Sequence, residues 1–103
     1  MDAPAAIAKR TFELSQSGRV EVSFFAPMAD GNDWRCEYRI EWPDRTRSHR
    51  AFGVDSVQAL LLAMKNVQAE LTNAPETLAE GLTWLGNVDL DLPSVRPAED
   101  SQS

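Results

Sequence analysis

The chain has little of the chemistry on which most enzyme active sites are built. Among 103 residues it has one cysteine, Cys36, and one histidine, His49. A single cysteine excludes an intramolecular disulfide, and a single histidine excludes a metal site with two imidazole ligands. The five glycines are scattered and form no phosphate-binding loop. We therefore predict a protein without a catalytic set, a cofactor or a metal site, and so not an enzyme.

Long hydrophobic runs are absent as well. The longest covers residues 59–64, far short of the roughly 20 residues that cross a bilayer. The N-terminal segment has an acidic residue at position 2 and its first basic residues only at positions 9 and 10, which is the reverse of a secretory signal. We expect no membrane association and a cytoplasmic location.

Positive charge is also scarce, because 16 acidic residues outnumber 10 basic ones and give a net charge of -6. The acids are concentrated in residues 54–103, which hold eight acidic and two basic side chains. The net negative charge of such a protein repels the phosphate backbone of nucleic acid, which a local positive patch would have to overcome. A small acidic inhibitor or immunity-type protein, whose C-terminal acids meet a basic partner, is one function consistent with this distribution.

Alternating apolar and polar residues predict four strands, over residues 8–15, 19–26, 34–42 and 45–54. The third strand is the clearest, because every second residue is apolar and the residues between them are charged. The apolar residues of this strand are Trp34, Cys36, Tyr38, Ile40 and Trp42. We expect this side of the strand to face the core and the charged side to face water.

Short turns separate these strands, which favours a meander. The run Asp-Gly-Asn-Asp at residues 30–33 predicts a turn, because it lacks the ligand spacing of a calcium-binding loop. The fourth strand has two possible orientations, with either residues 51 and 53 or residues 52 and 54 facing inward, and the sequence leaves both open. Gly53 is a candidate for a close approach between the helix and the sheet.

Residues 55–74 have the periodicity of an amphipathic helix. Asp55 and Gln58 can form a capping box at its start, and Pro75 prevents its continuation. The predicted core face is a stripe of large apolar side chains: Val57, Leu60, Leu61, Met64, Val67 and Leu71.

The other side of this helix is less polar than a solvated face should be. Its members form a second line at helical spacing: Ala59, Leu62, Asn66 and Ala69. Two interpretations stay open. Leu62 is either an isolated or covered leucine, or the small residues beside it let a second copy or another protein pack closely. We take this line as a candidate interaction surface, with homodimerisation as the expected mode.

Together these elements predict an α+β fold, in which a four-stranded antiparallel sheet (meander) carries one long helix on one face and a C-terminal strap. Residues 8–93 form the single α+β domain. We expect a flexible N-terminal arm at residues 1–7 and a disordered acidic tail at residues 94–103.

Two segments resemble a known family. The sequence W-R-C-E-Y-R-I at residues 34–40 and the sequence G-V-D-S-V-Q-A-L-L-L-A-M at residues 53–64 resemble small bacterial proteins classed as a domain of unknown function. The resemblance covers about residues 8–93. It implies a bacterial single-domain protein and brings no activity, ligand or catalytic residue with it.

Several residues with chemical potential have a structural explanation that we prefer. Cys36 lies on the apolar side of its strand, where burial disfavours a thiolate. His49 is a weak candidate for a general base because no ordered partner is identifiable for it. Asp89 and Asp91 are two residues apart and fit solvated acids better than a cation site.

The strongest cluster of positive charge lies on the third and fourth strands. It forms a candidate basic face of five side chains: Arg35, Arg39, Arg45, Arg47 and Arg50. With the aromatic Phe25 nearby, such a face could stack single-stranded RNA, although Glu37 and Glu41 cancel much of its field. We predict a non-catalytic protein-interaction module, with nucleic-acid binding by this face as a second alternative.

Overall fold

The computed structural model describes residues 4–94. Residues 1–3 and 95–103 lie outside the described residues, so most of the expected acidic tail and part of the expected arm are not covered. The first strand begins at Ala6, within the expected arm. No helix of the described chain is long and apolar enough to cross a membrane.

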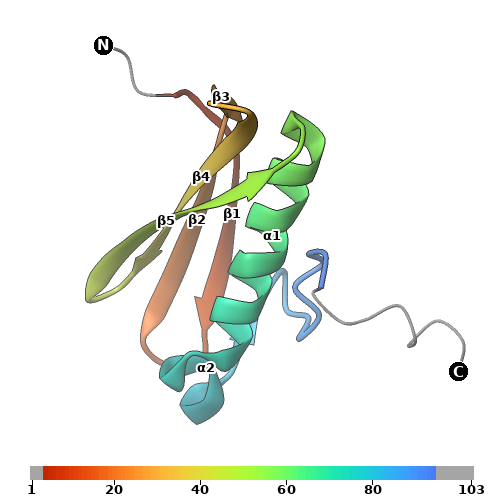
Figure 1. Cartoon of the computed structure of the whole chain (residues 1–103). Coiled ribbons are helices and arrows are strands. Elements are labelled where there is room, and N and C mark those ends of the chain that lie inside the picture. Colours follow the sequence, from red (N-terminus) through yellow and green to blue (C-terminus); the bar gives the residue numbers. More distant parts are fainter. Residues whose placement is uncertain (1–3, 95–103) are drawn as a thin grey trace, which may run out of the picture.

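The chain forms an antiparallel sheet and two helices (Figure 1). The elements in order are β1 (Ala6–Leu14), β2 (Gly18–Phe25), β3 (Met28–Asp30), β4 (Asp33–Trp42), β5 (Arg45–Gly53), α1 (Ser56–Asn73), α2 (Pro75–Glu80) and β6 (Leu82–Thr83). The α+β class, the antiparallel sheet and the long helix packed on it are therefore confirmed.

The sheet has six strands where the sequence predicted four. The four expected strands are β1, β2, β4 and β5, and each pairs antiparallel with the next, as in a meander. The two additional strands are short. β3 pairs with the start of β4 and is separated from β2 by Pro27, which has no N–H to donate to a ladder. β6 pairs with the end of β1 through only two residue pairs, so neither strand is long enough to show a hydrophobic period.

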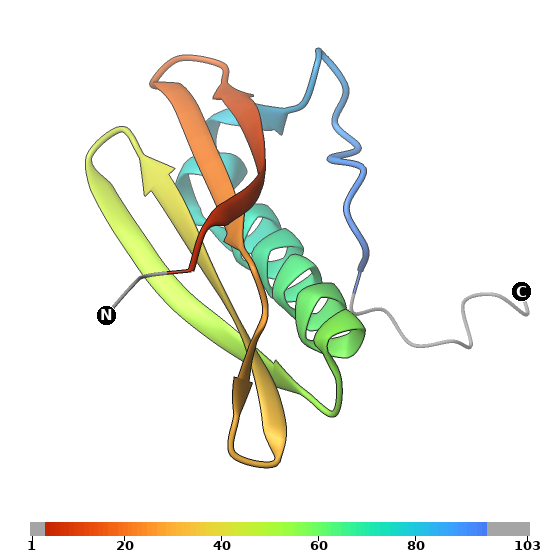
Figure 2. The same cartoon turned by 90° about the horizontal axis from the view of Figure 1, so that it is seen from above.

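The sheet curls around α1, which lies along the face formed mainly by β4 and β5 (Figure 2). Between the helix and the sheet lies one core, to which β4 contributes Cys36, Tyr38, Ile40 and Trp42, all buried. The predicted inward side of β4 is thus confirmed, with Trp34 partly buried at its end.

The inward side of β5 is settled by its pairing with β4, because opposed residues point to the same face. Cys36 is opposite Ala51 and Trp34 is opposite Gly53, so Ala51 and Gly53 face α1. A Cβ atom built on Gly53 would lie 2.5 Å from the backbone nitrogen of Ala59. The helix therefore meets the sheet here at a distance that only glycine permits.

This close approach explains why the predicted core face of α1 is only partly right, with Val67 and Leu71 buried as expected. The helix buries Ala59, Ala63, Val67 and Leu71. Val57 is 63% exposed and Leu61 is 42% exposed, although both belong to the predicted stripe. The hydrophobic periodicity of the sequence is dominated by its large apolar side chains. The space between the helix and β5 is too narrow for them, so α1 turns its alanines toward the sheet. Leu60 and Met64 are partly buried at the border of the core.

The segment after α1 is partly built into the sheet and is not a simple strap. α2 begins at Pro75 directly after α1, and β6 then joins the edge of β1. Beyond it the chain runs on the far side of α1 from β5 (Figure 2). It is held by Arg10, whose Nη1 donates to the carbonyl oxygens of Leu90 at 2.9 Å and Asp91 at 2.8 Å.

The rotated helix predicts a contrast between two alanines. We expect Ala63→Leu to lower the free energy of unfolding by about 1–3 kcal/mol, because Ala63 is fully buried against the sheet. The same change at Ala79, exposed on α2, should stay within about 0.5 kcal/mol. Urea denaturation of both variants measures the difference. Equal effects would contradict the orientation of α1 described above.

Candidate functional site

The five arginines of the candidate basic face do not share one side of the sheet. Opposed residues show this, since Arg47 pairs with Ile40 and Arg45 with Trp42, on the side covered by α1. Arg50 is opposite Glu37, on the other side of the sheet. Arg35 and Arg39 are also on that other side, so the predicted basic face is divided between the two faces of the sheet.

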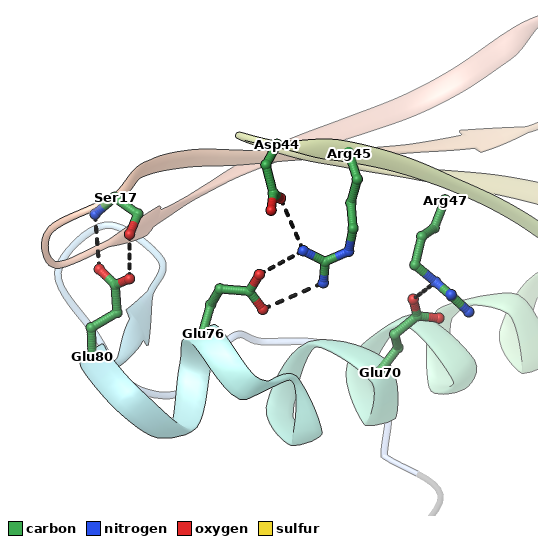
Figure 3. Close-up of polar contacts among 7 residues, drawn as sticks. All are labelled: Ser17, Asp44, Arg45, Arg47, Glu70, Glu76 and Glu80. Atoms are coloured by element: carbon green, nitrogen blue, oxygen red, sulfur yellow. Dashed lines mark hydrogen bonds and ion pairs between the residues drawn. The ribbon is translucent and has the colours of Figure 1, made fainter.

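The arginines on the helix side of β5 are bound to carboxylates of the helices (Figure 3). Nη1 of Arg45 lies 2.5 Å from Oε2 of Glu76 and 3.0 Å from Oδ1 of Asp44. Nε of Arg47 lies 2.5 Å from Oε2 of Glu70. The hydrogen bond from Arg45 lowers the pKa of Glu76 below its ordinary value. Both arginines thus tie β5 to the helices, and little of their charge is left for a ligand.

Glu80 makes a similar contact at the turn between β1 and β2 (Figure 3). Its carboxylate accepts a hydrogen bond from the hydroxyl of Ser17. It also accepts from the backbone N–H groups of Ser17 at 2.8 Å and Gln16 at 2.6 Å. These bonds favour the charged carboxylate, and the Ser17 hydroxyl is the largest cause of a lowered pKa at Glu80.

On the outer face of the sheet, opposite α1, Arg35 and Arg39 are in ion pairs, whereas Arg50 is in none with residues 4–94. Nη1 of Arg35 lies 3.2 Å from Oδ2 of Asp30, and its Nε lies 3.2 Å from Oε2 of Glu37. Nε of Arg39 lies 3.3 Å from Oε2 of Glu41. This lattice of ion pairs cancels most of the positive field that nucleic-acid binding would require.

The candidate interaction surface on α1 also needs correction. Ala59 is fully buried, Leu62 and Ala69 are partly buried, and only Asn66 is exposed. Ala59 cannot contact a partner, because it fills the space left by Gly53. Two small residues in the sequence could have indicated this burial: Gly53 at the end of a strand and Ala59 early in the helix that follows it.

The start of α1, together with the residue that precedes its N-cap, presents apolar side chains to water. We call Val54, Val57 and Leu61 the α1 strip, and Val54 is 73% exposed. Val57 and Leu61 are one helical turn apart and lie on the same side. The helix has only two charged residues, and Glu70 is taken by Arg47. Lys65 is therefore the one unpaired charge within α1, and the exposed N-cap Asp55 adds an acid at its start.

The residues with catalytic potential are not brought together. Cys36 is fully buried, and its Sγ donates to the carbonyl oxygen of Phe25 at 3.3 Å. Burial raises the pKa of the Cys36 thiol, and the charge of Glu37 raises it further. His49 is exposed and stacks on Tyr38, with ring centroids 6.1 Å apart.

The two acids near the C-terminus have local roles. The backbone N–H of Asp91 donates to Oδ1 of Asp89 at 2.9 Å. Within residues 4–94 no group of three or more histidine, cysteine or acidic side chains is placed to hold a metal ion.

Residues 8–94 match a family described as a domain of unknown function (DUF6968), and the chain belongs to that family. The match confirms the kind of family that the sequence resembles and the extent of the resemblance. No curated protein and no solved structure matches the chain.

The contacts of Glu80 predict a pH dependence of stability. Because its pKa is lowered in the folded state, its contribution is present above its ordinary pKa of 4.5 and is lost as the pH falls through the folded value. We expect Glu80→Gln to be less stable than the parent at neutral pH and to lose less stability on acidification. Urea denaturation at about pH 7 and between about pH 3 and 5 tests this. The control is Glu13→Gln, an exposed residue on β1; identical pH profiles for parent and Glu80→Gln would refute the prediction.

Proposed function

We propose that this member of the DUF6968 family is a non-catalytic protein-interaction module that forms a homodimer through the outward side of α1. The observation that carries the proposal is the α1 strip, three exposed apolar side chains with only Asp55 and Lys65 as nearby charges on the helix and its cap. Surface helices usually cover their outward side with charged groups, and exposed apolar patches mark interaction sites. The proposal includes a bacterial setting, as the sequence resemblance implies, and a cytoplasmic location, as the N-terminal segment and the lack of long hydrophobic runs suggest.

A second copy fits this surface for electrostatic reasons. The net charge of -6 makes two copies repel each other over most of their surface. Within Ser56–Asn73 the only acidic residue is Glu70, which is paired with Arg47, and the exposed Asp55 is the one acid beside the strip, so two molecules meet there with little repulsion. A twofold axis would place the same strip on both sides of the interface, with Leu61 of one copy beside Val57 or Leu61 of the other.

The expected affinity is modest. Three partly exposed side chains from each copy, each gaining about half of its full burial energy, contribute on the order of 5 to 9 kcal/mol. Association costs roughly 4 kcal/mol or more in lost translational and rotational freedom. The difference predicts a dimer that depends on concentration and dissociates on dilution, consistent with a regulated contact and not with an obligate one.

The two alternatives draw less support from the structure. Nucleic-acid binding would need free arginines, whereas four of the five candidates are in ion pairs. An acidic inhibitor would need exposed carboxylates for its partner, whereas Glu70 and Glu76 bind Arg47 and Arg45. Glu80 is bound to the turn at Ser17.

Charge placed on the α1 strip should dissociate the dimer. We expect sedimentation velocity to show dimers of the parent at about 200 µM, and Leu61→Glu, alone or with Val57→Glu, to weaken dimerisation at least about tenfold. Both positions are exposed, so the circular dichroism spectrum should not change. Leu78→Glu is the matched control, since Leu78 is 75% exposed on α2 and outside the strip. A parent that is monomeric at this concentration, or equal loss in Leu78→Glu, would sink the proposal.

A further inference from the structure

A cavity of about 280 Å³ lies on the outer face of the sheet, opposite α1. It is formed over β4 and β5, next to the end of β2 and the start of the described chain. Its lining residues are Pro4, Phe25, Glu37, Tyr38, Arg39, Ser48, His49 and Arg50. Small-molecule sites in proteins have this concave shape, a partly apolar lining and a few convergent polar groups.

Arg50 distinguishes this cavity from the rest of the sheet. The other four arginines of β4 and β5 each lie within ion-pair distance of at least one carboxylate. Arg50 forms no ion pair with any residue in the range 4–94, although it is opposite Glu37 in the sheet. Glu37 is engaged by Arg35 instead, at 3.2 Å. The N–H donors of the Arg50 guanidinium are therefore not paired with a protein carboxylate and can bind a ligand in the cavity.

Arg39 adds a second guanidinium and an aromatic surface. It lies over the ring of Phe25, 5.1 Å from the ring centroid. Its Nε is buried and makes no hydrogen bond, because its 3.3 Å contact with Glu41 has poor hydrogen-bond geometry. The stacked pair forms an apolar and positively charged wall. Ser48, opposite Arg39 in the sheet, brings a hydroxyl to the same place.

We propose that this cavity binds a small organic monocarboxylate whose aromatic or aliphatic part packs against Phe25. The carboxylate would accept two parallel hydrogen bonds from the fork of Arg50 and a further one from Ser48. The charged lining residues are Arg39, Arg50 and Glu37, two positive and one negative, which leaves a net charge of +1. One negative charge balances this lining, whereas the second negative charge of a phosphate dianion would be left unbalanced beside Glu37.

This site is independent of the proposed dimer. The cavity and the α1 strip are on opposite sides of the sheet, because Arg50 and Ser48 point away from the face that packs on α1. A dimer formed through α1 leaves the cavity open. Ligand binding and self-association can therefore be measured separately, and failure of one does not imply failure of the other.

The test is a titration of isotopically labelled protein with benzoate and with hexanoate, followed by backbone amide shifts in two-dimensional NMR spectra. At about pH 7 we expect saturable shifts at Phe25, Ser48 and Arg50 with a Kd in roughly the millimolar range. Arg50→Gln should weaken binding at least about tenfold, and Arg50→Lys should retain part of it, because lysine keeps the charge without the fork. Arg19→Gln, at an exposed position outside the lining, is the matched control and should bind normally.

Benzyl alcohol and inorganic phosphate are the comparison ligands. Benzyl alcohol keeps the ring without the charge, and phosphate keeps negative charge without the apolar part, so both should bind at least about tenfold more weakly than benzoate. The proposal is overturned if benzyl alcohol or phosphate binds as well as benzoate. It is also overturned if shifts do not saturate by about 50 mM benzoate, or if Arg50→Gln, with an unchanged spectrum elsewhere, binds like the parent.

Discussion

The close contact between α1 and the end of β5 is the constraint on which the arrangement of this protein depends. Gly53 has no room for a Cβ beneath the backbone of Ala59, so the helix rests directly on the strand. The small side chains along one edge of α1 then become its buried face. Large side chains that would otherwise face the core, Val57 and Leu61, are turned toward water. The surface that we propose for dimerisation is thus a consequence of how tightly the core is closed.

Much of the fold could be predicted from local patterns. The strict alternation in β4, the turn signals and the cap at Asp55 gave the four main strands and the long helix, and the Asp55 side chain does accept from the N–H of Gln58. What the sequence could not supply was the rotation of α1 and the orientation of β5. Both depend on which of two neighbouring residues in one strand faces inward, and periodicity carries little signal where alanine and glycine alternate with a phenylalanine.

The candidate site was less predictable for the same reason. Because the sequence did not fix which side of β5 faces the helix, the five arginines were predicted to lie on one face. For the same reason it could not show that Arg50 has no carboxylate partner among residues 4–94. The structure also explains why charge is divided along the chain. Two acids of the helical half, Glu70 and Glu76, neutralise arginines of β5, so part of the uneven charge of the sequence is an internal match between two halves of the fold. The exposed arginine that remains outside this match is the basis of the proposed carboxylate site.

The tight turn at Pro43 and Asp44 has a consequence for how chains of this kind can vary in length. Trp42 is opposite Arg45, so the turn between β4 and β5 has only two residues. Gaining or losing one residue there would slide one strand past the other by a single step and exchange the two sides of β5. Phe52 would then point at the helix, and Gly53 would no longer provide the gap. Insertions are consequently disfavoured at this hairpin, whereas Leu85 and Gly86, exposed at the tip of the turn between Trp84 and Asn87, can accept them.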